Sequence, residues 1–349
     1  MSSYDAILFV SFGGPEGPED VMPFLRNVLR GKNVPESRMQ AVAHHYDMFG
    51  GVSPINGQNR RLIENLKNEL KSRSIDLPVY WGNRNWHPML TDTLKEMEKA
   101  GVKKAMAFIT SAYSSYSGCR QYLEDIERAK AEANVEIEID KLRVFYNHPL
   151  FIQANVDNVK EGLLKFPESE RDGVAIAFTA HSIPLAMAET CAYARQLAEI
   201  SQLVSERIKH PNYQLVYQSR SGPAAQPWLE PDICDHIRAL HEQGVKNLLI
   251  HPVGFISDHM EIVYDLDTEA MALTKELGMT MVRSSTAGTH SLFQKMMGDL
   301  VQERLESSKG VEIERPSLGC QGAAPDFCEP TCCAYTPAAP QRSSAPASK

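Results

Sequence analysis

The sequence contains no apolar run long enough to cross a membrane. Its apolar stretches, such as residues 173–179 and 247–255, are far shorter than the roughly 20 residues that a transmembrane helix needs. An export signal is also missing, because the chain begins Met-Ser-Ser-Tyr-Asp and enters a strand-like run with no basic segment before it. We therefore expect a cytoplasmic protein without a transmembrane segment.

Positive charge is in short supply as well. The chain has 36 Lys and Arg against 44 Asp and Glu, which gives a formal net charge of −8. This is the wrong sign for a protein that coats nucleic acid by neutralising phosphates. With 349 residues, of which 43% are hydrophobic, the chain has room for two domains that each bury a core. We expect an enzyme or a binding protein, with a monomer as the simplest state.

The phosphate-binding glycine motifs are absent too. The loop Ser11-Phe12-Gly13-Gly14-Pro15-Glu16 follows the first apolar run but contains neither GxGxxG nor Gly-Lys-Ser/Thr. Glu16, Glu19 and Asp20 would repel a phosphate. Glycines at the end of a strand still let a ligand approach the backbone closely, so a flat ligand over this loop fits better than a nucleotide.

Short apolar runs alternate with longer helical patterns through most of the chain, which is typical of parallel α/β folds. We predict strands at 6–12, 79–82, 105–110, 142–146, 174–179, 215–218, 248–253 and 280–283. Apolar residues recur at helical spacing between them, as in Ile63, Leu66 and Leu70. The pattern predicts two doubly wound, Rossmann-like domains with parallel sheets and a short cysteine-rich extension.

Changes in composition predict the boundaries of these parts. The last of them contains Pro, Ala, Ser and Gln with almost nothing to bury. The predicted segments are an N-terminal α/β domain (1–148), a C-terminal α/β domain (149–288), a closing helix that packs back on the first domain (289–312), a cysteine-rich segment (313–333) and a disordered tail (334–349).

An imidazole and a row of carboxylates follow two of the predicted strands. His181 comes directly after strand 174–179, and Glu261, Asp265 and Glu269 follow strand 248–253 at helical spacing i, i+4 and i+8. Carboxylates in such a row repel one another, which favours a cation or proton path there. The alternatives are a backbone-satisfied loop histidine, a solvated acidic face, and a capping box of Asp258 with Glu261. Together, the imidazole and carboxylates suit a first-row divalent metal such as ferrous iron.

Four of the seven cysteines lie near the C-terminus, at Cys320, Cys328, Cys332 and Cys333. Disulfides are unexpected in a reducing compartment, and this segment has too few apolar residues to fold alone. A metal would order it. The spacing leaves zinc and an iron-sulfur cluster as equal alternatives.

Several of these stretches resemble the ferrochelatase family. The similar segments are Thr179-Ala180-His181-Ser182-Ile183-Pro184, Tyr217-Gln218-Ser219-Arg220 with Pro227-Trp228-Leu229-Glu230-Pro231-Asp232, and Gly254-Phe255 through Asp258-His259-Met260-Glu261. Gly50-Gly51-Val52-Ser53-Pro54-Ile55-Asn56 and the Ser-Phe-Gly-Gly-Pro-Glu loop resemble the bacterial coproporphyrin branch. The resemblance extends from about Tyr4 to Leu305.

The resemblance implies an enzyme that inserts ferrous iron into a porphyrin, a lyase of haem biosynthesis. Coproporphyrin III is favoured as substrate. Protoporphyrin IX, another metal or tetrapyrrole, and a non-catalytic haem or metal carrier are the alternatives. By family match, His181 and Glu261 handle metal and protons, while Asp265 and Glu269 continue the carboxylate row. The positions implied to contact porphyrin are Phe12, Arg30, Ser53 and Tyr122.

The chain departs from some family members at the porphyrin site. Phe12 stands where some have a tyrosine that could ligate iron, and His44 and His45 stand where some have arginine. Lys32 and Arg38 lie nearby and could compensate.

Some members also hold a [2Fe-2S] cluster on one internal and three C-terminal cysteines. The resemblance therefore favours such a cluster on Cys119, Cys320, Cys328 and Cys333, with Cys332 as a substitute.

Overall fold

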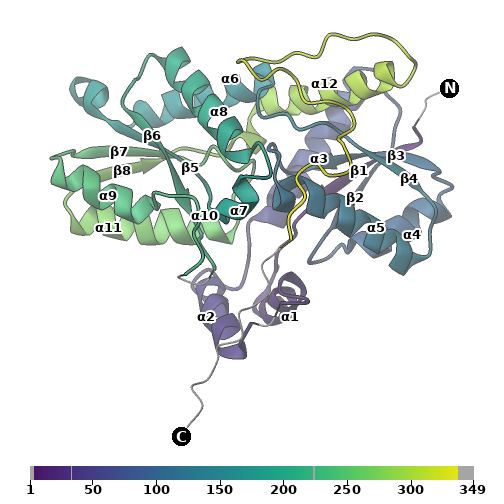
Figure 1. Cartoon of the computed structure of the whole chain (residues 1–349), viewed down its shortest axis with the longest axis horizontal. Coiled ribbons are helices and arrows are strands. Elements are labelled where there is room, and N and C mark those ends of the chain that lie inside the picture. Colours follow the sequence, from purple (N-terminus) through teal and green to yellow (C-terminus); the bar gives the residue numbers. More distant parts are fainter. Residues whose placement is uncertain (1–3, 33, 223–224, 337–349) are drawn as a thin grey trace, which may run out of the picture.

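The structure is a computed structural model that describes residues 4–32, 34–222 and 225–336. It contains two four-stranded parallel sheets, one in each half of the molecule (Figure 1). The first sheet has the order β2-β1-β3-β4. Its strands are β1 (Ala6–Ser11), β2 (Val79–Asn83), β3 (Lys104–Ile109) and β4 (Glu138–Lys141).

The second sheet repeats this topology, with the order β6-β5-β7-β8. Its strands are β5 (Ala175–His181), β6 (Tyr213–Gln218), β7 (Asn247–His251) and β8 (Thr280–Arg283). The central strands β1 and β5 are buried along almost their whole length because helices cover both faces of each sheet. The predicted fold class, two doubly wound parallel α/β units, is confirmed.

One predicted strand was wrong. Residues 142–146 form no strand, and the edge strand of the first sheet is β4, immediately before them. The sequence of β4, Glu-Ile-Asp-Lys, is polar because an edge strand is half exposed. Leu142, Val144, Phe145 and Tyr146 are buried as an irregular crossover, in which the backbone N–H groups of Phe145 and Tyr146 both donate to the carbonyl of Ala112.

The helices pack against the two sheets and between them. Those of the first half are α1 (Pro18–Val28), α2 (Glu36–Asp47), α3 (Ile55–Ser72), α4 (Leu90–Lys99) and α5 (Gln121–Ala133), with a π-helical turn η1 (Tyr116–Arg120) before α5. Those that follow are α6 (Pro149–Leu163), α7 (Leu185–Ala188), α8 (Tyr193–Ile208), α9 (Ile233–Glu242), α10 (Met260–Tyr264), a π-helical segment η3 (Asp265–Ala270), α11 (Met271–Glu276) and α12 (Ser291–Ser307). Two 3₁₀ turns are η2 (Glu168–Gly173) and η4 (Ala287–Thr289).

A single apolar core joins the two halves. It contains inner-face residues of both sheets, such as Phe9 and Phe178, together with residues of α3, α6, α8 and α12. Phe293 of α12 lies at its centre and contacts the rings of Phe108, Phe145 and Phe151. Helix α12 packs against both α3 and α6. The two halves are therefore held in a fixed relation by buried apolar surface.

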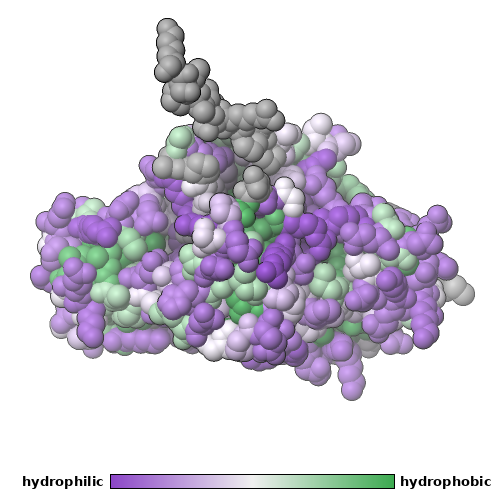
Figure 2. Space-filling view, turned by 90° about the horizontal axis from the view of Figure 1, so that it is seen from below, coloured by the Kyte–Doolittle hydropathy of each residue, from purple (hydrophilic) through white to green (hydrophobic). Residues whose placement is uncertain are grey.

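Helices α1 and α2 form a lip beside both halves (Figure 1). Phe24 and Tyr46 of the lip share a small apolar cluster with Met260, the first residue of α10. His45 of the lip stacks on Tyr264 of α10, with ring centroids 3.6 Å apart. Seen from this side, the surface is mostly hydrophilic, with separate apolar patches toward the left and in the middle of the view (Figure 2).

The C-terminal segment runs back from α12 across the front of the molecule, drawn in yellow in Figure 1. Most of the predicted disordered tail, residues 337–349, lies outside the described residues. No helix in the described part of the chain is long and apolar enough to span a membrane.

Candidate active site

His181 and Glu261 meet at the carboxyl edge of the second sheet. His181 ends β5, and Glu261 lies in the first turn of α10, which follows the neighbouring strand β7. The carboxyl ends of adjacent parallel strands are the usual place for ligands in open α/β sheets. His181 Nε2 lies 3.6 Å from Glu261 Oε1. Half of the Glu261 side chain is solvent-accessible, so an incoming group can reach the carboxylate.

The two groups shift each other's proton affinity strongly. Desolvation lowers the pKa of the His181 imidazole, but the Glu261 carboxylate outweighs it and raises this pKa to about 9. Desolvation likewise raises the pKa of Glu261, and the attraction of His181 overcomes it and lowers this pKa to about 2. At neutral pH and without a metal, the pair is therefore imidazolium and carboxylate.

The ring of His181 is held by its own loop. Its Nδ1 forms a short hydrogen bond with the carbonyl of Ser182, so Nδ1 carries a proton and Nε2 faces Glu261. Tyr193 donates its hydroxyl to the backbone carbonyl of His181 at 3.0 Å. The nitrogen that faces Glu261 is thus the one available to a metal once it loses its proton.

A second histidine faces Glu261 from the same segment. His259 Nδ1 lies 3.7 Å from Glu261 Oε2, and the pKa of His259 is lowered, mainly by desolvation. The sequence analysis assigned it no role. The one feature of the sequence that could have pointed to His259 is its position two residues before Glu261. This position alone does not distinguish a residue of the site from a helix cap.

The carboxylate row does not follow a regular α-helix. The helix widens into the π-helical segment η3 from Asp265 onward, so the predicted i, i+4, i+8 spacing of one continuous helix was wrong. Desolvation, helped by the charges of Glu261 and Glu269 and opposed by a hydrogen bond from Ser219, raises the pKa of Asp265 to about 7. Glu269 is exposed, and its pKa is also raised. The row thus has exposed carboxylates at both ends, Glu261 and Glu269, with the partly buried Asp265 between them.

Asp258 does not cap this helix. Residue His259 is the N-cap and makes no side-chain capping bond. The Asp258 carboxylate instead pairs with Arg283 of β8, whose guanidinium also binds Asp267 of η3. The capping-box alternative is therefore wrong. Arg283 ties the start and the middle of the carboxylate-bearing segment to the sheet.

Two of the predicted porphyrin residues lie around one arginine. The Arg84 guanidinium lies 4.3 Å from the ring centroid of Tyr122 and 5.7 Å from that of Phe12. Arg84 is itself buried and forms a short ion pair with the buried Asp125. Phe12 also packs in the cluster that contains Met260, next to Glu261. The sequence analysis missed Arg84 because a single arginine in a loop carries no pattern.

The other two predicted porphyrin residues lie on the same half but are separate from this group. Ser53 is buried against the Gly14 loop, where a Cβ on Gly14 would stand 2.8 Å from Ser53 Oγ. Arg30 is exposed just beyond α1 and donates to Asn27. Among the described residues it forms no hydrogen bond or ring contact with Phe12 or Tyr122.

Of the four C-terminal cysteines, three influence one another and the fourth, Cys320, lies apart. Cys332 and Cys333 Sγ lie 3.6 Å apart. The pKa of Cys328 is raised to about 11 by desolvation and then by the nearby thiols of Cys332 and Cys119. Cys333 is buried, and its pKa is raised by desolvation and by Cys332 and Cys119. Cys320 is exposed, and its thiol instead lies 3.1 Å from Glu199 Oε1.

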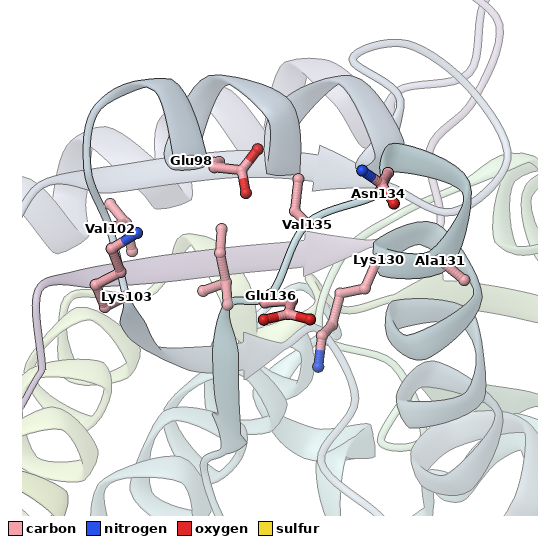
Figure 3. Close-up of a pocket in the computed structure, with 9 residues that line it drawn as sticks. Glu98, Val102, Lys103, Lys130, Ala131, Asn134, Val135 and Glu136 are labelled. Atoms are coloured by element: carbon pink, nitrogen blue, oxygen red, sulfur yellow. The ribbon is translucent and has the colours of Figure 1, made fainter.

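Neither the His181–Glu261 pair nor the cysteines are already arranged as a set of metal ligands. Among the described residues, no three His, Cys, Asp or Glu side chains stand together closely enough to hold a metal ion. A half-open pocket of about 570 Å³ lies elsewhere, between α4, α5 and the start of β4 (Figure 3). It is lined by residues such as Glu98, Lys103 and Lys130, at the amino edge of the first sheet, and includes no predicted site residue.

Comparison with known proteins identifies the family. The ferrochelatase family model matches residues 4–305. The chain belongs to the ferrochelatase family. It is 51% identical to a ferrochelatase of Rhodopirellula baltica, over 97% of this chain and 96% of that protein. It is 47% identical to a coproporphyrin III ferrochelatase of Streptomyces coelicolor, over 95% of this chain and 94% of that one.

Membership in the ferrochelatase family makes this chain a metallochelatase, a lyase that inserts iron into a porphyrin in haem synthesis. A solved structure titled SirB from Bacillus subtilis with Fe3+ shares the fold, with a TM-score of 0.55 and 15% identity over 87% of this chain and 97% of that one. The family and activity expected from the sequence are confirmed.

Proposed function

We propose that the chain inserts ferrous iron into coproporphyrin III, with His181 and Glu261 as the groups that handle the metal and the pyrrole protons. The observation that carries the proposal is the 3.6 Å approach of His181 Nε2 to Glu261 Oε1 at the carboxyl edge of the sheet. The choice of porphyrin is supported by relatives at 46–47% identity named coproporphyrin III ferrochelatase.

The reaction exchanges two protons for one cation without electron transfer. The free porphyrin carries two N–H protons, which must leave as Fe²⁺ binds the four nitrogens. An acceptor for these protons next to the ring lowers the barrier. Glu261 is ionised in the pair and accessible, so it can accept a proton directly.

We assign the other groups by their place along the carboxylate row. Arriving Fe²⁺ displaces the proton from His181 Nε2, and that nitrogen then holds the cation. While Nε2 holds the cation, the positive charge keeps Glu261 ionised. When Fe²⁺ passes to the porphyrin, Nε2 is left neutral and the proton affinity of Glu261 rises, so the imidazole and the carboxylate can take up the two pyrrole protons. Asp265, whose pKa is about 7, can both accept and release a proton at neutral pH and passes it toward the exposed Glu269.

The porphyrin itself is proposed to lie over Phe12, Ser53 and Tyr122, with Arg30 near the propionates. Arg84 supports this surface because its guanidinium packs on the Tyr122 and Phe12 rings. Phe12 has no atom that could ligate iron, so any metal ligand comes from the His181 side.

An anaerobic assay tests the proposal. Fe²⁺ is mixed with the protein and with coproporphyrin III or protoporphyrin IX, and insertion is followed by the Soret band. We expect faster insertion into coproporphyrin III. Glu261→Gln should abolish insertion but leave porphyrin binding nearly unchanged, whereas Glu276→Gln, an exposed control on α11, should behave as wild type. Full-rate insertion by Glu261→Gln would contradict the catalytic assignment, and a non-catalytic carrier would show binding without insertion.

We also propose that the C-terminal cysteines hold a [2Fe-2S] cluster. Support comes from Cys328, Cys332 and Cys333, whose thiols interact with each other or with the internal Cys119. Four soft thiolates are the donor set that such a cluster uses. The electrostatic influence of Cys119 on Cys328 and Cys333, and the separate placement of Cys320 at Glu199, favour Cys119, Cys328, Cys332 and Cys333 as ligands in place of the predicted set with Cys320. When bound, the cluster would order this segment.

The remaining assignments are proposed as the sequence predicted them. We propose domains at 1–148 and 149–288, a closing helix over 289–312 and a cluster segment over 313–333. A cytoplasmic location is supported by the seven cysteines, which form no disulfides. We propose a monomer, which size-exclusion chromatography with light scattering tests.

A further inference from the structure

Gln218 connects the two strand ends that carry the proposed catalytic pair. It is the last residue of β6 and lies opposite His181 in the parallel register of β5 and β6. Its backbone carbonyl accepts a hydrogen bond of 2.8 Å from the N–H of Ser182, the residue after His181. Gln218 is 1% exposed. Its main chain therefore fixes the loop from which the imidazole projects.

The side chain of Gln218 reaches the other partner. Its Nε2 lies 3.2 Å from the backbone carbonyl of Glu261 and 3.3 Å from Asp265 Oδ2. The backbone carbonyl of Glu261 can only accept, so the amide nitrogen must face it, and this partner fixes the orientation of the amide. Gln218 thus contacts the His181 loop through its backbone and the Glu261 helix through its side chain.

The neighbourhood of Gln218 shows further constraint. Ser219 has a φ of +62°, a left-handed conformation that non-glycine residues seldom adopt. In this conformation its hydroxyl forms a short hydrogen bond to the same Asp265 oxygen that Gln218 approaches. The Oε1 of Gln218 is buried and has no hydrogen-bond partner among the described residues. A buried acceptor left unsatisfied is costly, so packing alone does not account for a glutamine here.

We propose that Gln218 is a positioning residue for metal insertion, which sets the distance between His181 and Glu261. The proposal rests on the function proposed above for that pair. The Glu261 carbonyl already accepts the N–H of Asp265 within its helix, and the amide of Gln218 adds a second bond just before the helix widens. Without it, the hydrogen bond from Ser219 to Asp265 would remain as a link between the end of β6 and this segment.

The effect is expected in the chemical step. Porphyrin binding uses other residues, whereas proton removal and metal transfer need His181 and Glu261 at a fixed separation. A misplacement of about 1 Å in such a site can reduce the rate by roughly a hundredfold. We therefore expect Gln218→Leu, which keeps the volume but removes the amide, to lower kcat by about tenfold or more. The Kd for coproporphyrin III should change less than about twofold.

A matched control separates position from stability. Gln196 is also buried and uses its amide in two hydrogen bonds, to the backbone N–H and the hydroxyl of Ser114, away from the pair. Gln196→Leu should lower the melting temperature at least as much as Gln218→Leu, yet keep kcat near wild type. Gln218→Asn serves as a second variant because it retains an amide that is too short to reach Glu261. Its kcat should fall as well.

The experiment measures kcat, porphyrin Kd and melting temperature for wild type and the three variants with Fe²⁺ and coproporphyrin III under anaerobic conditions. A kcat within about twofold of wild type in both Gln218 variants would overturn the proposal. So would an equal loss of kcat in Gln196→Leu, because general loosening would then explain the effect. If wild type itself inserts no metal into any porphyrin, the proposed function fails instead, which keeps the two failures distinct.

Discussion

His181 is the residue whose chemistry depends most on its surroundings. Its imidazole has a pKa of about 9 in the pair with Glu261, compared with an ordinary value of 6.5. Because a metal must displace the proton on Nε2, the apparent affinity for the metal should rise with pH until about pH 9. Glu261 thus keeps His181 charged in the empty site, and in the proposed mechanism it accepts a pyrrole proton as the metal passes to the porphyrin.

This predicts a measurable change when the carboxylate is removed. In Glu261→Gln, desolvation remains while the main opposing attraction is lost, so the pKa of His181 should fall well below 9. Imidazole nitrogen shifts followed by NMR across pH 5–10 measure it directly. A metal competes with the proton on His181 only below the pKa of this residue. The zinc affinity of the variant should therefore stop rising at a lower pH than that of wild type. A His181 pKa that stays near 9 in the variant would show that Glu261 is not its partner.

Arg84 and Asp125 allow a second prediction for a single residue. Both are buried, and Asp125 has one further partner, Arg128. Arg84→Met leaves the largely buried Asp125 carboxylate with Arg128 as its partner. It also removes the guanidinium that packs on the rings of Tyr122 and Phe12. We expect a loss of about 3 kcal/mol of unfolding free energy, measured by urea denaturation. The double variant Arg84→Met/Asp125→Leu should recover part of it, and no recovery would mean that the charge pair is not the cause.

At the level of secondary structure, the sequence predicted most elements but not the two that deviate from simple patterns. Buried parallel strands such as β1 are continuous apolar runs and were placed nearly in full. The crossover at Leu142–Tyr146 is equally apolar, but it is buried in the core shared by the two halves and belongs to no sheet. No local sequence pattern distinguishes such a buried irregular segment from a buried strand. The helix widens at Asp265, where Gln218 and Ser219 from the end of another strand form hydrogen bonds with this residue, and a single segment cannot reveal such contacts.

The same distinction applies to the candidate site. His181, Glu261 and Asp265 were placed from their positions after two strands. His259, Arg84 and Gln218 could not be, because their roles come from residues far away in sequence. Cys320 matched the family arrangement, but the conformation of its loop directs its thiol to Glu199.

The end of β5 packs closely against the loop after β7, where Gly254 faces Ala180. A Cβ on Gly254 would stand 2.5 Å from the Cβ and 2.7 Å from the Cα of Ala180, which precedes His181. Gly254→Ala must therefore push the end of β5 away. We expect a loss of about 1–3 kcal/mol in urea denaturation together with a lower kcat. Gly173→Ala, where a Cβ meets nothing within 4 Å, should change neither. A wild-type kcat in Gly254→Ala would show that the position of His181 tolerates this shift.

For the whole molecule, the C-terminal segment acts as a strap across both halves. Asn147, in the crossover between them, exchanges hydrogen bonds with Leu318 and Gly322. Glu199 of α8 accepts the N–H of Cys320 at 2.7 Å and the amide of Gln321 at 3.2 Å. Arg120 of the first half binds the carbonyls of Pro330 and Cys332. The strap thus contacts the second half, the crossover and the first half in turn.

Removing the Glu199 contact should loosen this strap. Glu199→Ala loses the hydrogen bonds from Cys320, Gln321 and Tyr146, so segment 316–335 should be cleaved about tenfold faster by a nonspecific protease under native conditions. Glu206→Ala, at an exposed position on the same helix, is the control. Equal cleavage rates in the two variants would show that the strap does not depend on Glu199.

The strap also decides which cysteines can act together. Cys320 is held at Glu199, whereas the charges of Cys119 and Cys332 affect the thiols of both Cys328 and Cys333. Cys320→Ser should therefore retain the proposed cluster, and Cys119→Ser and Cys333→Ser should lose it. Iron and acid-labile sulfide content, visible absorbance, and EPR after dithionite reduction measure retention independently of activity. If Cys320→Ser loses the cluster and Cys332→Ser retains it, the ligands are those predicted from the sequence. The segment would then have to rearrange when the cluster binds. A colourless wild-type protein that contains zinc would instead make the thiols a structural zinc site, for which tetrahedral coordination by four thiolates is equally suited.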